Sequence, residues 1–316
     1  MGASMVKKCV GCFDKAIESC SEHQALRTAV VHPVRAVDIE TVSEATNRGL
    51  IDPVLVGPAA RIQSAAEEAG IDISSFQIVS TEHSHEAAQV SAKMAASGEV
   101  NALMKGGLHS DEILHAVIVT RSLMTERRLS HAYLMDIPTY HKPLVITDAA
   151  VNISPDLDIK ADICQNAIYF WRALFGGNQK PKVALLAAVE TVNGKMQATI
   201  DAACLCKMAE RGQILDGIID GPLAFDNAIS VEAAKSKGIV SEVAGDPDIL
   251  IPPNLESCNI LAKQLTFLGN AKAAGIILGA RVPIILTSRA DSIETRLMSC
   301  ALAVKVAAAR TRGAFK

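Results

Sequence analysis

A hydroxyl and a guanidinium stand side by side where a short apolar run gives way to a predicted helix. Ser288 and Arg289 precede a helix expected over 291–310. A helix N-terminus stabilises a nearby anion by roughly 0.3–1 kcal/mol, and a guanidinium presents a planar fork that matches phosphate oxygens. The pair therefore indicates an anion site with a hydroxyl that can donate to a developing charge. The alternative is a plain helix cap, because Asp291 and Glu294 have the spacing of a capping box.

A lysine and two glycines follow an earlier apolar run. The run at 102–104 is expected to be a short strand, and a helix is expected to start near Ser110. Backbone N–H groups at a helix start, together with a lysine, suit an anion such as phosphate. An ordinary turn between strand and helix would use the same residues. The candidate binding residues of this junction are Lys105, Gly106, Gly107, His109 and His115.

Three further junctions between apolar runs and helices carry polar side chains. Asp148 ends one run, and Asp220 ends another, directly before a Gly-Pro turn. Asn259 and Lys263 are four residues apart and therefore share one face of a helix expected over 254–268. Each has a structural alternative: Asp148 can cap a turn, the segment around Asp220 can be a plain turn, and a surface lysine is usually only solvated.

The elements that must position these residues follow from the alternation of apolar runs and amphipathic segments. This alternation predicts an α/β fold with mostly parallel sheets covered by helices. Ligands bind such sheets beyond the carboxyl ends of the strands. A four-residue repeat of apolar side chains, Met196, Ile200, Cys204 and Met208, marks one stripe of a helix. We expect strands at 54–56, 102–104, 183–189, 214–219, 249–251, 275–278 and 282–286, and helices at 59–69, 83–97, 254–268 and 291–310.

Composition excludes several classes of protein. The chain has 316 residues, 49% of them hydrophobic and 21% charged, which is enough to bury a large core. Only 3% are aromatic and the net charge is -3, which argues against nucleic acid as a partner. No apolar run approaches the ~18 residues that a membrane helix needs. The eight cysteines are scattered. This pattern indicates the cytoplasm and predicts no metal site.

The junctions resemble the phosphate acetyl/butyryl transferase family from about Val54 to the C-terminus. Two further stretches, 130–136 and 188–193, are similar to phosphate acetyltransferase domains that in some proteins are fused behind an enoyl-CoA hydratase domain. The segments that match the family in order and spacing are 220–228, 248–252 with Asn259 and Lys263, and 287–292.

The resemblance implies a two-lobed fold like that of isocitrate and isopropylmalate dehydrogenases. Residues 1–124 and 279–316 would form the first lobe and residues 125–278 the second, with the active site in the cleft between them. It also implies a homodimer. The substrates would be acyl-CoA and inorganic phosphate, with coenzyme A released and no permanently bound cofactor.

The resemblance also implies roles for individual residues. Arg289 would bind phosphoryl oxygens and Ser288 would stabilise the tetrahedral carbonyl oxygen. The family has an aspartate seven residues after this serine, where this chain has Thr295, so we expect Asp291 to act as the base. A family arginine falls near His115. The expected substrate-binding residues are Lys105, Gly106, Gly107, His109, His115, Asp148, Asp220, Asn259, Lys263 and Thr287.

The sequence therefore predicts a reversible transfer of a short acyl group between CoA and phosphate, giving acyl phosphate. Acetyl is the favoured group and butyryl the alternative. Two rivals belong to other classes. One is a metal- and nicotinamide-dependent decarboxylating dehydrogenase, which shares the implied fold. The other is a catalytically silent acyl-CoA-binding protein that has lost the family's base.

Overall fold

The computed structural model describes the chain except residues 1–19, 21–22, 177–178, 288–290 and 313–316. The described residues divide into two compact units. Of the described residues, the first unit combines those from Cys20 to Arg127 with those from Ala274 onward, and the second unit lies within Arg128–Ala273. A continuous stretch is therefore inserted into the first unit.

The first unit is built on a sheet whose neighbouring strands are, in order, β3, β2, β1, β4, β11 and β10. Neighbouring strands in this order run parallel, except that β10 and β11 are antiparallel. Apart from β3, which is partly exposed, the strands are mostly buried apolar runs, which suits a sheet covered on both faces. Their bounds are β1 Leu26–Val31, β2 Ile51–Gly57, β3 Gln77–Ser80, β4 Ala102–Lys105, β10 Lys272–Leu278 and β11 Ile284–Ile285.

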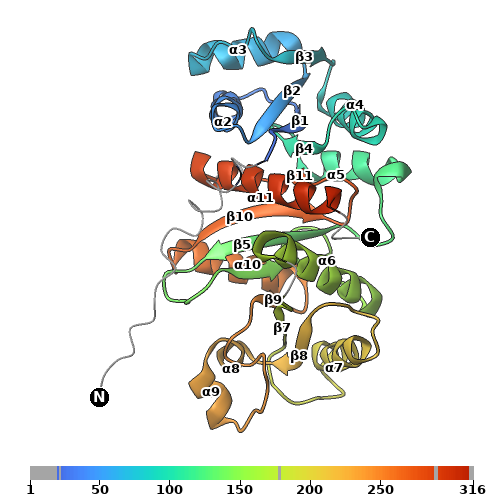
Figure 1. Ribbon diagram of the computed structural model, residues 1–316, viewed down its shortest axis with the longest axis vertical. Helices are drawn as coiled ribbons and strands as arrows, with labels where there is room; N and C mark the ends of the chain where they lie inside the picture. The colour runs from blue at the N-terminus through green and yellow to red at the C-terminus, as the bar shows by residue number, and fades with distance from the viewer. Residues whose placement is uncertain (1–19, 21–22, 177–178, 288–290, 313–316) are drawn as a thin grey trace. The chain divides into compact units, whose positions relative to one another are not determined.

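Helices cover both faces of this sheet, with α2 and α4 on opposite sides of β1 and β2 (Figure 1). α2 packs against α3 and α11, and α4 packs against α5. Glycine ends two of these helices in the left-handed conformation, at Gly70 and Gly98. The bounds are α2 Ala36–Asn47, α3 Ala59–Ala69, α4 Ser84–Ser97, α5 Ser110–Val119, η2 Arg121–Leu123 and α11 Ile293–Thr311.

The second unit has a sheet in the strand order β5, β6, β9, β7 and β8. β5 is antiparallel to β6, and the other pairs are parallel. Residues from the strands and from α8 and α10 form one apolar core, which includes Ile146, Leu250 and Cys258. The strand bounds are β5 Ser130–Asp136, β6 Leu144–Thr147, β7 Lys182–Leu186, β8 Ile218–Leu223 and β9 Ile249–Ile251.

Five helices flank this second sheet, and α7 and α8 lie on opposite sides of β8 in Figure 1. α10 is capped at its N-terminus by Asn254, whose side chain accepts a hydrogen bond from the N–H of Ser257. The bounds are α6 Leu157–Phe175, α7 Gln197–Glu210, α8 Phe225–Ile229, α9 Val231–Ser236 and α10 Leu255–Phe267.

The α/β class is confirmed, and so are most expected elements. Helix α3 and strand β9 have the expected bounds. Several strand boundaries were wrong: β2 and β10 each begin three residues earlier than expected, and β11 is only Ile284–Ile285. β7 ends at Leu186, three residues before the apolar run does, and β8 begins only at Ile218. The apolar runs continue past the strands into residues that are not all buried, such as the exposed Ala188 and Leu215, so hydropathy alone misplaces the ends.

The packing face of α7 also differs from the expected stripe. Met196, Ile200, Cys204 and Met208 are only partly buried. The buried residues of α7 are Thr199, Asp201, Ala202 and Leu205. An ion pair accounts for this difference, because the carboxylate of Asp201 pairs with Lys160 of α6 at 2.6 Å. This ion pair turns a face with a buried charge toward α6.

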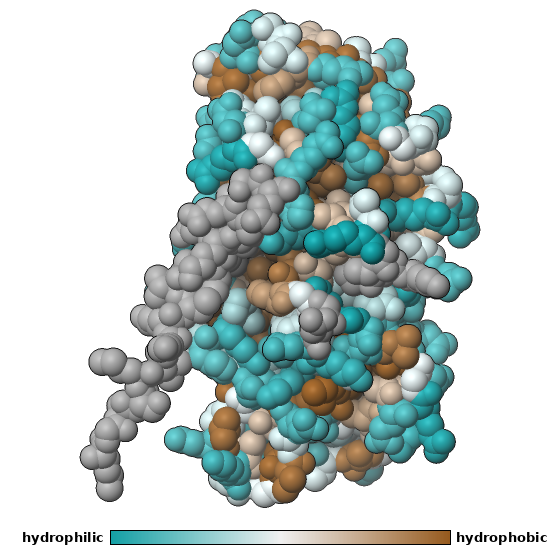
Figure 2. All heavy atoms as spheres, in the orientation of Figure 1, coloured by the Kyte–Doolittle hydropathy of each residue, from teal (hydrophilic) through white to brown (hydrophobic). Residues whose placement is uncertain are grey.

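On the face drawn in Figure 2, hydrophobic side chains are interspersed with hydrophilic ones. Among the described residues, no helix combines the length and apolarity that a membrane crossing requires.

Candidate functional site

Two of the predicted junctions come together at the carboxyl ends of β4 and β11. The parallel register places Ile285 of β11 beside Met104 of β4. Lys105 is the last residue of β4, and Thr287 follows β11, so both leave neighbouring strands at the same edge of the sheet. Both side chains are buried, and Lys105 is only 6% exposed. The structure thus brings Lys105 and Thr287 to neighbouring strand ends, although they are 182 positions apart in the sequence.

The two glycines after β4 serve a close approach of backbone to backbone. The N–H of Gly106 donates to the carbonyl of Val31 at 2.9 Å, and the N–H of Gly107 donates to the carbonyl of His32 at 2.8 Å. A Cβ on Gly106 would lie 2.6 Å from the Val31 oxygen. The expectation that these N–H groups bind an anion is therefore corrected: the loop after β1 already occupies them.

The helix after this junction begins at Ser110, as expected, and carries acid at its start. Asp111 and Glu112 occupy the first turn of α5, and the Glu112 carboxylate accepts from the N–H of His109 at 3.0 Å. The hydroxyl of Ser84 donates to the same carboxylate and lowers its pKa, although burial acts in the opposite direction. His109 and His115 are both exposed.

The start of α11 is capped differently from the sequence prediction. Ser292 is the N-cap, and its hydroxyl accepts from the N–H of Thr295 at 3.2 Å. Asp291 therefore precedes the cap, and it is partly buried. A serine hydroxyl accepts a hydrogen bond from a backbone N–H at a helix start as well as a carboxylate does. Spacing alone therefore could not choose between Ser292 and Asp291 as the cap. Ser288 and Arg289 lie outside the described residues.

His32, at the carboxyl end of β1, was missed by the sequence analysis. Its φ of 56° is in the left-handed region that residues other than glycine rarely adopt. Its Nδ1 is buried and has no hydrogen-bond partner. Burial lowers the pKa of the imidazole, with a further contribution from Arg61. Strained, incompletely paired groups concentrate at functional sites. The His-Pro pair directly after an apolar run was the available signal.

A buried ion cluster close to this loop was also missed. Arg35 and Arg296 both contact the carboxylate of Asp38, which is 2% exposed. Arg35 and Asp38 have a helical spacing of three residues, which is a local signal. Arg296 lies far away in the sequence, so only the fold reveals its partner.

In the second unit, Asp148 organises the loop after β6. Its two carboxylate oxygens accept from the N–H groups of His131, Ala150, Val151 and Asn152 at 2.9–3.1 Å, and from the side-chain amide of Asn152 at 2.6 Å. These five hydrogen bonds use the lone pairs of the carboxylate. Of the two roles that the sequence left open, the geometry supports the turn cap.

The junctions after β6 and β9 also meet, because these strands are parallel neighbours. The side-chain amide of Asn259 donates to the carbonyl of Ala149 at 3.0 Å, which joins α10 to the loop held by Asp148. Lys263, one turn further along α10, is exposed. Asn259 therefore has a positioning contact, and Lys263 is solvated.

The remaining junction differs from its expected position. Asp220 lies inside β8, with Leu223 ending the strand, and its carboxylate accepts from the N–H of Gly221 at 2.8 Å. The strand continues past Asp220 because its register with β7 shifts at this point. β8 is separated from β6 by β7 and β9, so Asp220 is not beside Asp148.

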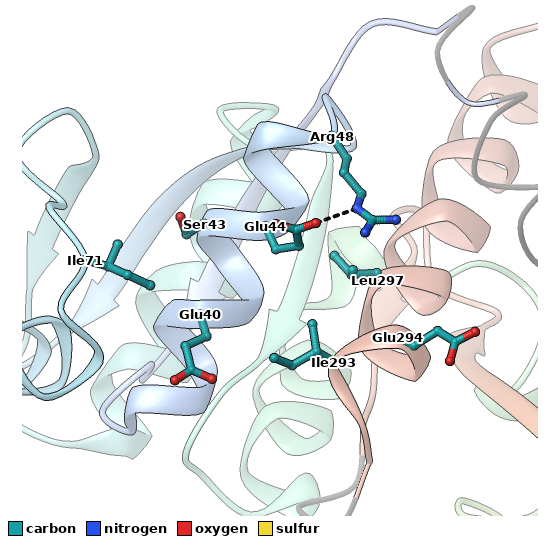
Figure 3. A pocket seen from close by; sticks show the side chains of 8 residues that line it. All are labelled: Glu40, Ser43, Glu44, Arg48, Ile71, Ile293, Glu294 and Leu297. Carbon is teal, nitrogen blue, oxygen red and sulfur yellow. Dashed lines mark hydrogen bonds and ion pairs between the residues drawn. The ribbon is translucent and has the colours of Figure 1, made fainter.

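Two surface hollows lie away from these strand ends. One, of roughly 380 Å³, lies between α2 and α11 (Figure 3). Its acidic side chains disfavour an anionic ligand, and its arginine donates to Glu44. It is lined by Glu40, Ser43, Glu44, Arg48, Ile71, Ile293, Glu294 and Leu297.

The second hollow, of roughly 580 Å³, lies at the amino ends of β6 and β7. Its Lys142 and Lys182 both pair with Asp246, at 2.9 and 2.7 Å. Hydrogen bonds from these two lysines hold the pKa of Asp246 at about 2, against the opposing effect of burial. Since ligands bind α/β sheets at the carboxyl ends of strands, neither hollow is the site that the fold favours. Among the described residues, no His, Cys, Asp and Glu side chains group as metal ligands would.

Comparison with known proteins shows what the chain is similar to. Residues 82–304 match the family model described as phosphate acetyl/butaryl transferase. The chain is 51% identical over 299 residues to a phosphate acetyltransferase of Rhizobium meliloti, covering 94% of each chain. It is 38% identical over 297 residues to a phosphate butyryltransferase of Clostridium beijerinckii, covering 94% of this chain and 98% of that protein.

Solved structures agree with the fold. A branched-chain phosphotransacylase from Enterococcus faecalis V583 aligns with a TM-score of 0.77 at 28% identity, covering 89% of this chain and 99% of that one. A phosphotransacetylase from Streptococcus pyogenes aligns with a TM-score of 0.81, covering 95% and 99%. At 19% identity, the latter likeness supports the fold alone.

Proposed function

The chain belongs to the phosphate acetyl/butyryl transferase family, and from this premise we propose that it transfers an acetyl group between coenzyme A and inorganic phosphate. The observation that carries the proposal is the 51% identity to a phosphate acetyltransferase over 94% of both chains. The butyryltransferase relative is more distant, at 38% identity. Acetyl-CoA is therefore the favoured substrate and butyryl-CoA the second candidate.

In the proposed reaction a phosphate oxygen attacks the thioester carbonyl carbon. A C–O bond forms, the C–S bond breaks, and the sulfur leaves as a thiolate that takes up a proton. A thiol with an ordinary pKa of about 8.5 needs only modest help to ionise in the reverse direction. Holding the two reactants together supplies much of the rate enhancement by orientation.

We assign the chemistry to the turn between β11 and α11. Arg289 binds phosphoryl oxygens, Ser288 donates to the tetrahedral carbonyl oxygen, and Asp291 exchanges the thiol proton. The described residues on either side support this assignment. Thr287 is buried beside the end of β4, and Asp291 is half-buried one residue before the cap of α11. Lys105 and Thr287 complete the proposed phosphate-binding edge.

We also propose a homodimer that acts in the cytoplasm without a permanently bound cofactor. An exposed apolar strip on α10 supports the dimer: Ile260, Phe267 and Leu268 are 65%, 74% and 80% exposed. Cys164, Cys204, Cys206, Cys258 and Cys300 are free thiols, which supports a reducing compartment.

The test is release of CoA thiol from acetyl-, propionyl- and butyryl-CoA, with and without phosphate. We expect phosphate-dependent release that is fastest with acetyl-CoA. A faster reaction with butyryl-CoA would move the assignment to the butyryltransferases, and no turnover of any acyl-CoA would refute the proposal. Full activity in Asp291→Asn would show that Asp291 is not the base.

A further inference from the structure

Three charged side chains form a chain of contacts beside the carboxyl ends of β1 and β4. The Nε and Nη2 atoms of Arg35 donate to the two oxygens of the Asp38 carboxylate at 2.9 and 2.5 Å. Arg296 approaches the same carboxylate with its Nη1 at 3.3 Å. Asp38 and Arg296 are 2% and 1% exposed, whereas Arg35 is 30% exposed. Asp38 and Arg296 therefore form the buried part of the cluster, and Arg35 is its accessible end.

The accessible end is an oriented guanidinium. The Asp38 carboxylate accepts two hydrogen bonds from Arg35. The Nη2 of Arg35 also donates to the carbonyl of Gly106 at 3.3 Å. Within the described residues, the Nη1 of Arg35 has no hydrogen-bond partner. A bidentate grip on one edge of a guanidinium fixes the direction of the opposite edge. Arg35 thus presents unused donors without the freedom of a surface arginine.

The position of Arg35 is the one where an α/β sheet binds ligands. From β1 the sheet continues to β2 and β3 on one side and to β4 on the other, so the strand order reverses between β1 and β4. Such reversal points open a crevice at the carboxyl ends of the strands. The contact from Arg35 to Gly106 joins the loop after β1 to the loop after β4 across this point.

The backbone N–H groups of Gly106 and Gly107 cannot supply the anion recognition in this place. The N–H groups of Gly106 and Gly107 are bonded to the carbonyls of Val31 and His32. In the cluster, the accessible side chain that can donate in their place is Arg35.

We propose that Arg35 binds a phosphoryl group of the substrate and that Asp38 and Arg296 are positioning residues that orient it. The inference rests on the proposed function for the identity of the ligand. The phosphoryl group belongs either to inorganic phosphate or to coenzyme A, since both present the same oxygens to a guanidinium.

Arg296 connects this anchor to α11. Its Nε donates to the carbonyl of Asp291 at 3.2 Å, just ahead of the helix. Asp38 therefore holds two elements at once, the loop after β1 through Arg35 and the start of α11 through Arg296. Removing its charge leaves a buried guanidinium without that counterion, which is a strongly destabilising change.

The first test is steady-state kinetics of Arg35→Gln and Arg35→Lys. Phosphate is varied at saturating acetyl-CoA, and acetyl-CoA at saturating phosphate. Loss of a charge-assisted hydrogen bond predicts that Arg35→Gln raises KM for one substrate about 10- to 100-fold, with a smaller change in kcat. Arg35→Lys retains the charge but loses the planar fork of the guanidinium. Its KM should therefore lie between those of the wild type and Arg35→Gln. A rise in the phosphate KM assigns the group to phosphate, and a rise in the acetyl-CoA KM assigns it to coenzyme A.

The matched control is Arg27→Gln. Arg27 pairs with Asp52 at 2.7 Å near the amino end of the same strand β1. It reports any general effect of breaking an Arg–Asp pair in the first unit, and we expect both KM values to stay at wild-type levels. Unchanged KM values for both substrates in Arg35→Gln would overturn the inference.

The positioning role predicts non-additive effects. Asp38→Asn frees the Arg35 guanidinium, so it should raise the same KM as Arg35→Gln. The double variant should then be no worse than Arg35→Gln within about twofold, because each change removes the same interaction. Independent, multiplied effects would overturn the positioning role. Arg35→Gln alone keeps the test valid if Asp38→Asn does not fold.

Calorimetric titration with inorganic phosphate and with coenzyme A separates this inference from the proposed function. Weaker binding of one of these probes to Arg35→Gln supports the inference even if the wild-type protein turns over no acyl-CoA, a result that would refute the acyltransferase. Equal binding of both probes by wild type and Arg35→Gln would overturn the inference while activity persists.

Discussion

The guanidinium of Arg296 lies 3.3 Å from the carboxylate of Asp38, although the two residues are 258 positions apart in the chain. Asp38 is in the first turn of α2 and Arg296 in the first turn of α11. A fully buried arginine needs a counterion, and α2 supplies it. The contact therefore fixes α11 against α2.

The Ser288 hydroxyl is predicted to act on the chemical step. Ser288→Ala should lower kcat by about 10²- to 10³-fold, the usual cost of losing one oxyanion donor. Ser292→Ala is the matched control, because it removes the cap hydroxyl of α11 and should cost about 1 kcal/mol of stability with kcat retained. Initial rates of thiol release and thermal melting measure the two effects. An active Ser288→Ala would remove this serine from the mechanism.

Gly106 is predicted to tolerate no side chain. In Gly106→Ala the new Cβ would lie 2.6 Å from the carbonyl oxygen of Val31 and 2.9 Å from that of His32, so backbone must move. We expect a destabilisation of at least 1–3 kcal/mol, roughly the cost of overpacking a well-packed site. Gly194→Ala, with no atom within 4 Å of its Cβ, should be nearly neutral. Denaturant unfolding of both variants provides the comparison, and equal midpoints would contradict the prediction.

The buried imidazole of His131 is predicted to lower the stability of the folded protein in mild acid. Burial lowers the pKa of this imidazole to about 4 in the folded chain, although Asp148 opposes the shift. The unfolded histidine titrates near 6.5 and so binds more protons between these values. The stabilisation is complete above pH 6.5 and is lost as the pH falls toward 4, with a total on the order of 3 kcal/mol.

The measurement is the urea midpoint of the wild type and of His131→Phe between pH 4 and 7. The phenyl ring cannot be protonated, so the variant should lose much of the slope in this window. His85→Gln removes an exposed imidazole and serves as the control. An unchanged slope in His131→Phe would show that another group causes the acid sensitivity.

The buried pair Lys160–Asp201 is predicted to be costly to break. Both side chains are 8% exposed, and Gln197 donates to the second carboxylate oxygen. Lys160→Met leaves a buried carboxylate without its cation and should cost about 3–5 kcal/mol. Breaking the exposed Lys207–Glu210 pair on the same helix should cost less than about 1 kcal/mol. A double variant, Lys160→Met with Asp201→Leu, should recover stability, and chemical unfolding reports all three.

The apolar strip of α10 is predicted to hold the homodimer together. Phe267→Asp places a charge on this strip and should convert dimer to monomer, as measured by light scattering coupled to gel filtration. Val240→Asp changes a side chain that is 99% exposed and should leave the mass unchanged. A dimeric Phe267→Asp protein would place the interface elsewhere.

Local patterns in the sequence predicted α3, α4, α10 and α11 to within two residues of their bounds, but they did not predict the strands β1, β3 and β5 or the helices α2 and α6. Glycines in the left-handed conformation end α3 and α4 where the sequence predicted, since these signals act within one turn of chain. The strand-end position of Lys105 was equally local. The family resemblance added the reaction and the roles of Ser288 and Arg289, which no local pattern contains.

The tertiary structure decided which strand ends meet and which polar groups remain available. The sequence suggested that the N–H of Gly106 binds an anion, but in the structure this N–H donates to a carbonyl at the end of β1. The carboxylate of Asp148 accepts hydrogen bonds from its own loop. Arg35, Asp38 and Arg296 became a cluster only when α2 and α11 packed together. Sequence periodicity located many elements but did not give the buried face of α7, and contacts between distant elements depend on how the sheet orders its strands.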